Sequence, residues 1–136
     1  MNWLISSLIA MICWGVWGFL MKIASKYYNW HQIFVVTSIS TLTAAFLVLI
    51  LFRPVINVQS EGFRYAFLAG VIGIIALLAF YSGIGGGKAI IVVPLTSLYP
   101  VITTILSYLI LREEVSLMKG TGIFLAFIAI LLISLD

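Results

Sequence analysis

Long apolar stretches alternate along the chain with short interruptions that contain charged residues, glycine or proline. Each stretch is of membrane-crossing length, because a hydrocarbon core of ~30 Å takes about 20 helical residues at 1.5 Å per residue. The pattern therefore predicts an all-α polytopic membrane protein with five transmembrane helices. They are expected at residues 3–23, 32–52, 64–84, 89–111 and 119–135 of a single domain covering residues 1–136.

The fourth stretch differs from the others because it combines an uncharged apolar run with two prolines, Pro94 and Pro100. A proline inside a helix frees the carbonyl one turn earlier, and such breaks persist where other helices, hydroxyls or water satisfy the backbone. We therefore expect this helix to form an inner wall of the bundle. The hydroxyls of Thr96, Ser97 and Thr104 are expected to satisfy the carbonyls that Pro100 frees. A kink that serves packing alone is the alternative.

Aromatic and small residues mark the first and third predicted helices. Trp14 and Trp17 are expected near the middle of the membrane, where they either pack against neighbours or line a solute path. Gly70, Gly73 and Tyr81 share one face of the third helix, which predicts a ridge suited to close backbone contact.

A glycine cluster at residues 83–87 separates the third and fourth helices. It does not match a phosphate-binding loop, because Ser82 occupies the first glycine position and Ala89 follows Lys88. We expect a tight turn between antiparallel helices and no nucleotide site.

Composition supports the membrane assignment and narrows the functions. Hydrophobic residues make up 64% of the chain and charged residues 8%, with a mean hydropathy of +1.28. A water-soluble domain is usually about 45–50% apolar and about 25% charged, so a water-soluble class is excluded. The net charge of +3 comes from few ionic groups, so no nucleic-acid partner is expected.

The sequence has no pattern that predicts catalysis. There is no Ser–His–acid set, no metal-ligand cluster and no H-E-x-x-H motif, so we expect neither an enzyme nor a metal or cofactor site. The acids Glu61, Glu113, Glu114 and Asp136 all fall at segment ends. A carboxylate within the membrane is the default proton-coupling group of a transporter, so proton-for-cation exchange is not expected.

The basic residues are divided almost evenly between the two sides of a five-helix topology. One side collects Arg53, Arg64, Arg112 and Lys119, and the other collects Lys22, Lys26 and Lys88. The positive-inside rule depends on an excess, and this excess is small. Insertion in both orientations, and with it an antiparallel homodimer, is the resulting hypothesis.

An ordered set of short motifs resembles the EamA-type family of the drug/metabolite transporter superfamily. The matching motifs are Trp14-Gly15, Trp17-Gly18, Phe80-Tyr81, Lys88-Ala89, Val93-Pro94-Leu95-Thr96, Leu98-Tyr99-Pro100, Glu113-Glu114 and Gly120-x-Gly122. The family typically carries two five-helix halves in inverted orientation. This chain has the length of one half, so it resembles a short, single-repeat member.

The resemblance implies an exporter or facilitator of small metabolites such as amino acids, working by alternating access in the plasma (cell inner) membrane of a prokaryote. A small-molecule substrate, the lipid bilayer and a second copy of the chain are the implied partners. A non-transporting auxiliary or scaffold subunit is the alternative function. Carried over from the family, the cavity candidates are Trp14, Trp17, Tyr81, Pro94, Ser97, Pro100 and Thr104.

Overall fold

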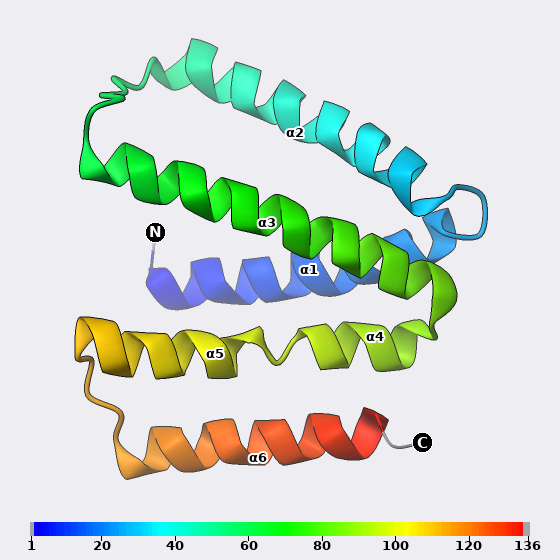
Figure 1. The fold of residues 1–136 in the computed structure, drawn as a ribbon, viewed down its shortest axis with the longest axis vertical. Coiled ribbons are helices and arrows are strands. Elements are labelled where there is room, and N and C mark those ends of the chain that lie inside the picture. The colour runs from blue at the N-terminus through cyan, green and yellow to red at the C-terminus, as the bar shows by residue number, and fades with distance from the viewer. Residues whose placement is uncertain (1, 135–136) are drawn as a thin grey trace. The chain divides into compact units, whose positions relative to one another are not determined.

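The computed structural model describes residues 2–134, which form helices and connecting segments without any strand. The five predicted helical segments are all present, and the fourth is divided (Figure 1). The all-helical prediction is therefore confirmed. Contacts group the chain into two compact units, Met1–Gly86 and Gly87–Asp136, which are described separately below.

The first unit consists of α1 (Trp3–Ala24), α2 (Trp30–Phe52) and α3 (Glu61–Gly86). Polar side chains set the helix starts. The Asn2 Oδ1 atom accepts a hydrogen bond from the Leu4 N–H at 3.2 Å, and the Asn29 N–H donates to Gln32 Oε1 at 2.9 Å. Such caps satisfy backbone N–H groups that lack a partner within the helix.

The third helix is longer at both ends than the sequence pattern predicts. The Ser60 hydroxyl accepts from the Phe63 N–H at 3.1 Å, so the helix begins at Glu61 rather than at Arg64. At its other end α3 continues through Gly86, so the tight turn predicted over residues 83–87 is wrong. A helix satisfies its own backbone groups, which favours it over an open turn in an apolar environment.

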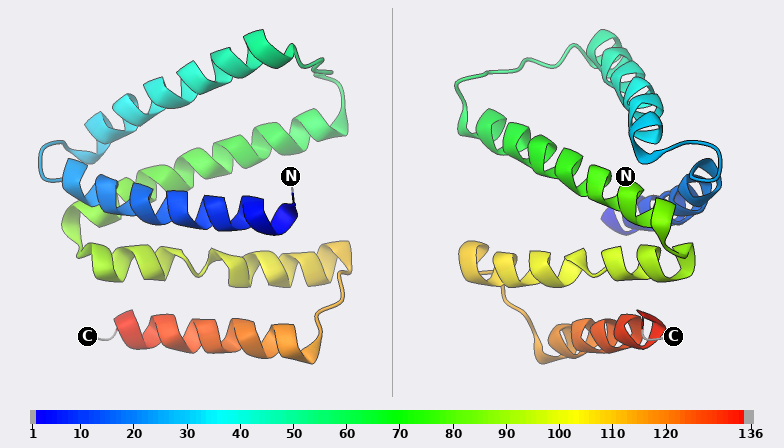
Figure 2. Two further views of the ribbon diagram at one scale, coloured as in Figure 1. Left: turned by 180° about the vertical axis from the view of Figure 1, so that it is seen from behind. Right: turned by 45° about the vertical axis from the view of Figure 1, so that its right-hand side comes forward.

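Within the first unit, α3 contacts both α1 and α2. Figures 1 and 2 show α2 and α3 running antiparallel and approaching most closely where α2 begins and α3 ends. The buried side chains gather at that end: Ile33 of α2 and Tyr81 and Ile84 of α3, with Gly18 of α1. The glycine ridge lies farther along α3, and no atom comes within 4 Å of a Cβ built at Gly70 or Gly73. The close contact predicted there is absent from the described part of the chain.

The second unit consists of α4 (Ala89–Thr96), α5 (Tyr99–Leu106), the π-helical turn η1 (Ser107–Leu111) and α6 (Leu117–Ser134). Helix α6 contacts α4. The Ser116 hydroxyl accepts from the Lys119 N–H at 3.4 Å at the start of α6. The predicted end of this helix at residue 135 lies outside the described residues.

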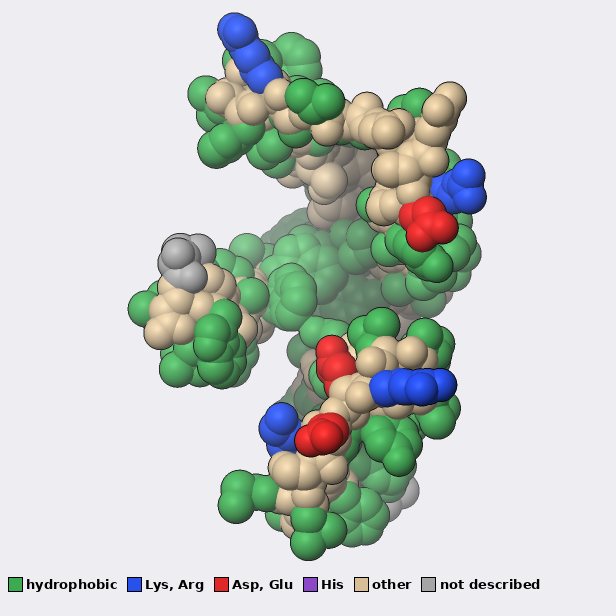
Figure 3. Space-filling view, turned by 90° about the vertical axis from the view of Figure 1, so that its left-hand side faces the viewer, with side chains coloured by type: hydrophobic (Ala, Val, Ile, Leu, Met, Phe, Trp, Pro, Cys, Tyr) green, Lys and Arg blue, Asp and Glu red, His purple; other side chains and the backbone are tan. Residues whose placement is uncertain are grey.

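Length and surface character are those of membrane-spanning helices. Among residues 2–134, four helical segments are long and apolar enough to cross a bilayer: Trp3–Ala24, Trp30–Phe52, Glu61–Gly86 and Ala89–Leu111. The described apolar part of α6, Leu117–Ile133, is shorter. On the face shown in Figure 3, charged side chains lie at helix ends and hydrophobic side chains cover the helix flanks. Large apolar residues are exposed along the helices, as expected for helices surrounded by lipid rather than by water.

Candidate functional site

The fourth membrane segment is interrupted at Ser97 and Leu98, between its two prolines. Pro94 lies inside α4, and Pro100 lies in the first turn of α5, where a missing N–H is tolerated. The Ser97 N–H donates to the carbonyls of Val93 and Pro94, both at 3.0 Å. Tighter i→i−3 bonds follow from the Leu98 N–H to the Leu95 carbonyl and from the Val101 N–H to the Leu98 carbonyl. Pro100 therefore starts a new helix instead of bending a continuous one.

The hydroxyls around the interruption bond to carbonyls of their own helices. The Thr96 Oγ1 donates to the Val92 and Val93 carbonyls at 2.9 and 3.0 Å, and the Ser97 Oγ donates to Val93 at 2.8 Å. The Thr104 Oγ1 donates to the Pro100 carbonyl at 2.9 Å. The carbonyl that lacks a donor because of Pro100 is that of Thr96, one turn earlier. The prediction that these three hydroxyls satisfy it is wrong, since each bonds elsewhere.

Local backbone geometry changes again after α5. The five-residue turn η1 closes with a hydrogen bond from the Arg112 N–H to the Ser107 carbonyl, and Arg112 adopts a left-handed conformation with φ 56°. The Glu113 N–H donates to the same carbonyl at 3.3 Å. Short π-helical turns occur frequently at functional sites, and nothing in the hydrophobic pattern predicts this one.

A hollow of about 580 Å³ lies beside this turn, between the α5–η1 segment, the connection at residues 112–116 and the start of α6. Val115, Gly122, Ile123 and Ala126 form part of its wall, and we call it the polar hollow because three hydroxyls and three charged groups also line it. They are Thr103, Thr104, Ser107, Glu113, Glu114 and Lys119. Of the predicted site residues, only Thr104 lines it. In the sequence, Glu113 and Glu114 stand out only as acids at a segment end, and no motif points to Thr103, Ser107 or Lys119.

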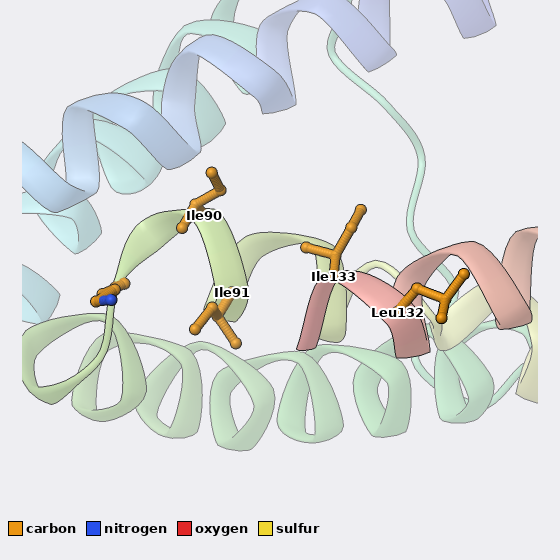
Figure 4. A pocket seen from close by; sticks show the side chains of 5 residues that line it. Ile90, Ile91, Leu132 and Ile133 are labelled. Atoms are coloured by element: carbon orange, nitrogen blue, oxygen red, sulfur yellow. The ribbon is translucent and has the colours of Figure 1, made fainter. Parts of the chain in front are cut away.

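A second, apolar hollow of about 410 Å³ lies at the other end of the same unit. Figure 4 shows Ile90 and Ile91 from α4 and Leu132 and Ile133 from α6 around it, and Lys88 completes the lining. With one polar side chain in its wall, it provides little basis for orienting a polar ligand.

In the first unit, Trp17 and Tyr81 come together in a cluster of aromatic rings. The Trp17 ring stacks on Phe80 with centroids 5.0 Å apart and lies 6.1 Å from the Tyr81 ring at a tilt of 46°. Tyr81 is 1% exposed, and its hydroxyl donates to Thr37 Oγ1 at 3.0 Å. The cluster thus joins α1, α2 and α3.

A lysine closes the same end of the first unit. The Lys22 Nζ atom, in the last turn of α1, donates to the Ile84 carbonyl of α3 at 3.0 Å. A cation at the carboxyl end of a helix complements the partial negative charge there and satisfies a terminal carbonyl.

The remaining predicted site residues divide between the units. Trp14, on α1, is 61% exposed. In the second unit Ser97 lies at the interruption, Pro94 and Pro100 lie on either side of it, and Thr104 lies farther along α5. Contact of any of the seven predicted residues with a solute stays a prediction.

Four long apolar helical segments, one of which is interrupted and has polar groups at its end, and a shorter apolar helix define the class of the protein. It is a polytopic integral membrane protein. The model of the EamA-like transporter family matches residues 1–135, and the chain belongs to this family. It is therefore a membrane transporter of the drug/metabolite type, and the family is one of transporters rather than enzymes.

An uncharacterized protein of Methanocaldococcus jannaschii is 33% identical to the chain over 133 residues. The match covers 98% of this chain and 96% of that relative, so the two chains are nearly equal in length. No solved structure matches the chain.

Proposed function

We propose that the protein carries small polar metabolites, such as amino acids, across the plasma membrane of a prokaryote by alternating access. The interrupted fourth segment is the observation that carries this proposal. Discontinuous membrane helices are common at the binding sites of transporters, where the unwound backbone faces a cavity instead of lipid. Between Thr96 and Tyr99 the segment is interrupted, with Pro94 and Pro100 on either side of the break.

Two inverted copies of the chain would supply the halves that alternating access requires. Support comes from the length of the Methanocaldococcus jannaschii relative, which is nearly the same as that of this chain. The nearly even distribution of Lys and Arg supports it as well, because it favours neither orientation strongly. We infer an antiparallel homodimer as the working unit.

Reconstitution of the purified protein alone into liposomes tests the proposal. Uptake or release of radiolabelled amino acids and other small metabolites is compared between protein-containing and empty vesicles. Movement of at least one solute that saturates with concentration is the expected result. If no solute of the panel is transported, and a second membrane protein co-purifies with the chain and restores flux, the chain is instead an auxiliary subunit.

A further inference from the structure

The polar hollow concentrates charge at the end of a membrane segment that is otherwise uncharged. Glu113 and Glu114 are two of the three acidic residues within residues 2–134, and both line it together with Lys119. Both signs of charge therefore border one space of about 580 Å³, which is large enough for a small organic molecule.

The hydroxyls of the hollow add directional polar groups with different roles. Thr103 and Thr104 already donate their hydroxyl hydrogens to the carbonyls of Tyr99 and Pro100, at 3.2 and 2.9 Å. Their oxygens remain acceptors, because a hydroxyl has two acceptor lone pairs. The half-buried Ser107 hydroxyl has no hydrogen-bond partner in the described part of the chain, so it is able both to donate and to accept.

These groups discriminate among ligands by charge. Two carboxylates and one ammonium line the hollow, so a simple anion meets two repulsions and one favourable contact, and a simple cation is repelled by the Lys119 ammonium. A ligand that carries both an ammonium and a carboxylate satisfies both signs through charge-assisted hydrogen bonds.

We propose that the polar hollow binds a small zwitterion, with the ligand ammonium at Glu113 and Glu114 and its carboxylate at Lys119. The threonine oxygens accept from the ammonium, and Ser107 bonds to either end. The proposal rests on the proposed function, for which the hollow serves as a recognition site at the end of the fourth segment, separate from the interruption at Ser97.

Calorimetric titration of the detergent-purified protein with L-alanine, ethylamine and propionate tests the charge argument, because the three probes have similar size. Alanine is expected to bind at least about tenfold more tightly than either single-charge analogue, which corresponds to about 1.4 kcal/mol. Equal affinity for all three, or preference for a singly charged probe, contradicts the proposal.

Charge-removing variants locate the site. The double substitution Glu113→Gln/Glu114→Gln and the substitution Lys119→Met are each expected to weaken alanine binding about tenfold or more, as loss of a charged hydrogen bond does. Glu61→Gln and Lys26→Met remove the same types of charge in the first unit and are expected to leave binding unchanged. If alanine binds with equal affinity to the Glu113, Glu114 and Lys119 variants and to the two control variants, the hollow is not the binding site.

A labelling experiment measures occupancy of the hollow directly and does not depend on the charge-removing variants being stable. Cys13 is the single cysteine of the sequence, so Cys13→Ser provides a background for Ser107→Cys. Alanine is expected to slow modification of the new thiol by a methanethiosulfonate reagent, whereas propionate is not. Absence of protection by alanine counts against occupancy of the hollow.

A phosphatidylethanolamine headgroup has an ammonium and an anionic group in common with an amino acid, so the labelling is repeated in vesicles. Protection by alanine in pure phosphatidylglycerol vesicles supports a free solute. Protection by added phosphatidylethanolamine alone overturns that assignment and makes the lipid the occupant. If the variants of Glu113, Glu114 and Lys119 still transport solute saturably with an unchanged KM, the hollow is not the binding site. The proposed transporter function would not be affected by that result.

Discussion

Tyr81 shows how one side chain links three helices in a protein with few buried residues. Its ring lies beside Trp17 of α1, and its hydroxyl donates to Thr37 of α2. Thr37 in turn donates to the carbonyls of Ile33 and Phe34, at 2.9 and 3.1 Å. A polar group buried in apolar surroundings needs such a partner, since leaving it without one costs about 1–3 kcal/mol.

The substitution Tyr81→Phe is expected to lower the free energy of unfolding by about 1 kcal/mol, the net contribution of a typical buried hydrogen bond. Thermal unfolding of the detergent-solubilised protein measures the change. Tyr108→Phe is the matched control, because Tyr108 is exposed and its hydroxyl has no partner within residues 2–134. In a double-mutant cycle with Thr37→Val, additive losses would show that the two hydroxyls are not coupled.

A second residue-level prediction concerns Lys22, whose ammonium bonds to the Ile84 carbonyl at 3.0 Å. Lys22→Met keeps the aliphatic stem and removes the charge, and we expect a loss of roughly 1–2 kcal/mol in stability because the bond is charge-assisted and partly buried. Lys26→Met serves as the control, since Lys26 is exposed in the loop after α1. Equal unfolding temperatures for the two variants would contradict a stabilising role for Lys22.

At the scale of elements, the fourth membrane segment is two short helices rather than one kinked helix. Proline alone does not specify this outcome, because Pro94 is accommodated inside α4 while the chain breaks just before Pro100.

Replacing Pro100 by Ala restores an N–H that can bond to the Thr96 carbonyl, so we expect the helix to become continuous through Ser97 and Leu98. Flux in liposomes is expected to fall about tenfold or more with little loss of folded protein, because a continuous helix bends less readily. Slower hydrogen exchange at residues 97–101 reports the structural change.

Pro54→Ala is the control for this substitution, since Pro54 lies in the connection after α2, outside the membrane segments. If the Pro100→Ala variant, at equal expression, shows the same flux as the unsubstituted protein, the break has no role in transport.

At the scale of the whole molecule, the charge distribution bears on how the chain inserts. Four basic residues against three is a weak orientation signal, so we expect a C-terminal reporter to be labelled from both sides of the membrane. Adding a lysine to the loop at residues 54–60 strengthens one side, and the reporter is then expected in one compartment with loss of flux. Labelling of the unsubstituted protein from one side only would rule out the antiparallel homodimer.

Much of the fold was predictable because helix formation in lipid is nearly compulsory for an apolar stretch of sufficient length. Residues 3–23 and 32–52 were expected as helices and correspond to α1 and α2. The helix ends were harder to place, because they depend on single hydrogen bonds such as the cap from Ser60 at the start of α3. The glycines up to Gly86 remain helical for the same reason that the apolar stretches do: no water is present to satisfy an open backbone.

The sequence by itself determined the class of the protein and its five helical segments, since these follow from apolar length. Only the tertiary structure decided that Tyr81 joins three helices, that Lys22 reaches the end of α3 and that Glu113, Glu114 and Lys119 line one hollow with three hydroxyls. The Tyr81 and Lys22 contacts join residues far apart in the chain, and the hollow lies beside the left-handed turn at Arg112. Periodicity along a sequence carries no information about such contacts, because it reports which face of a helix is apolar and not which helix lies against it.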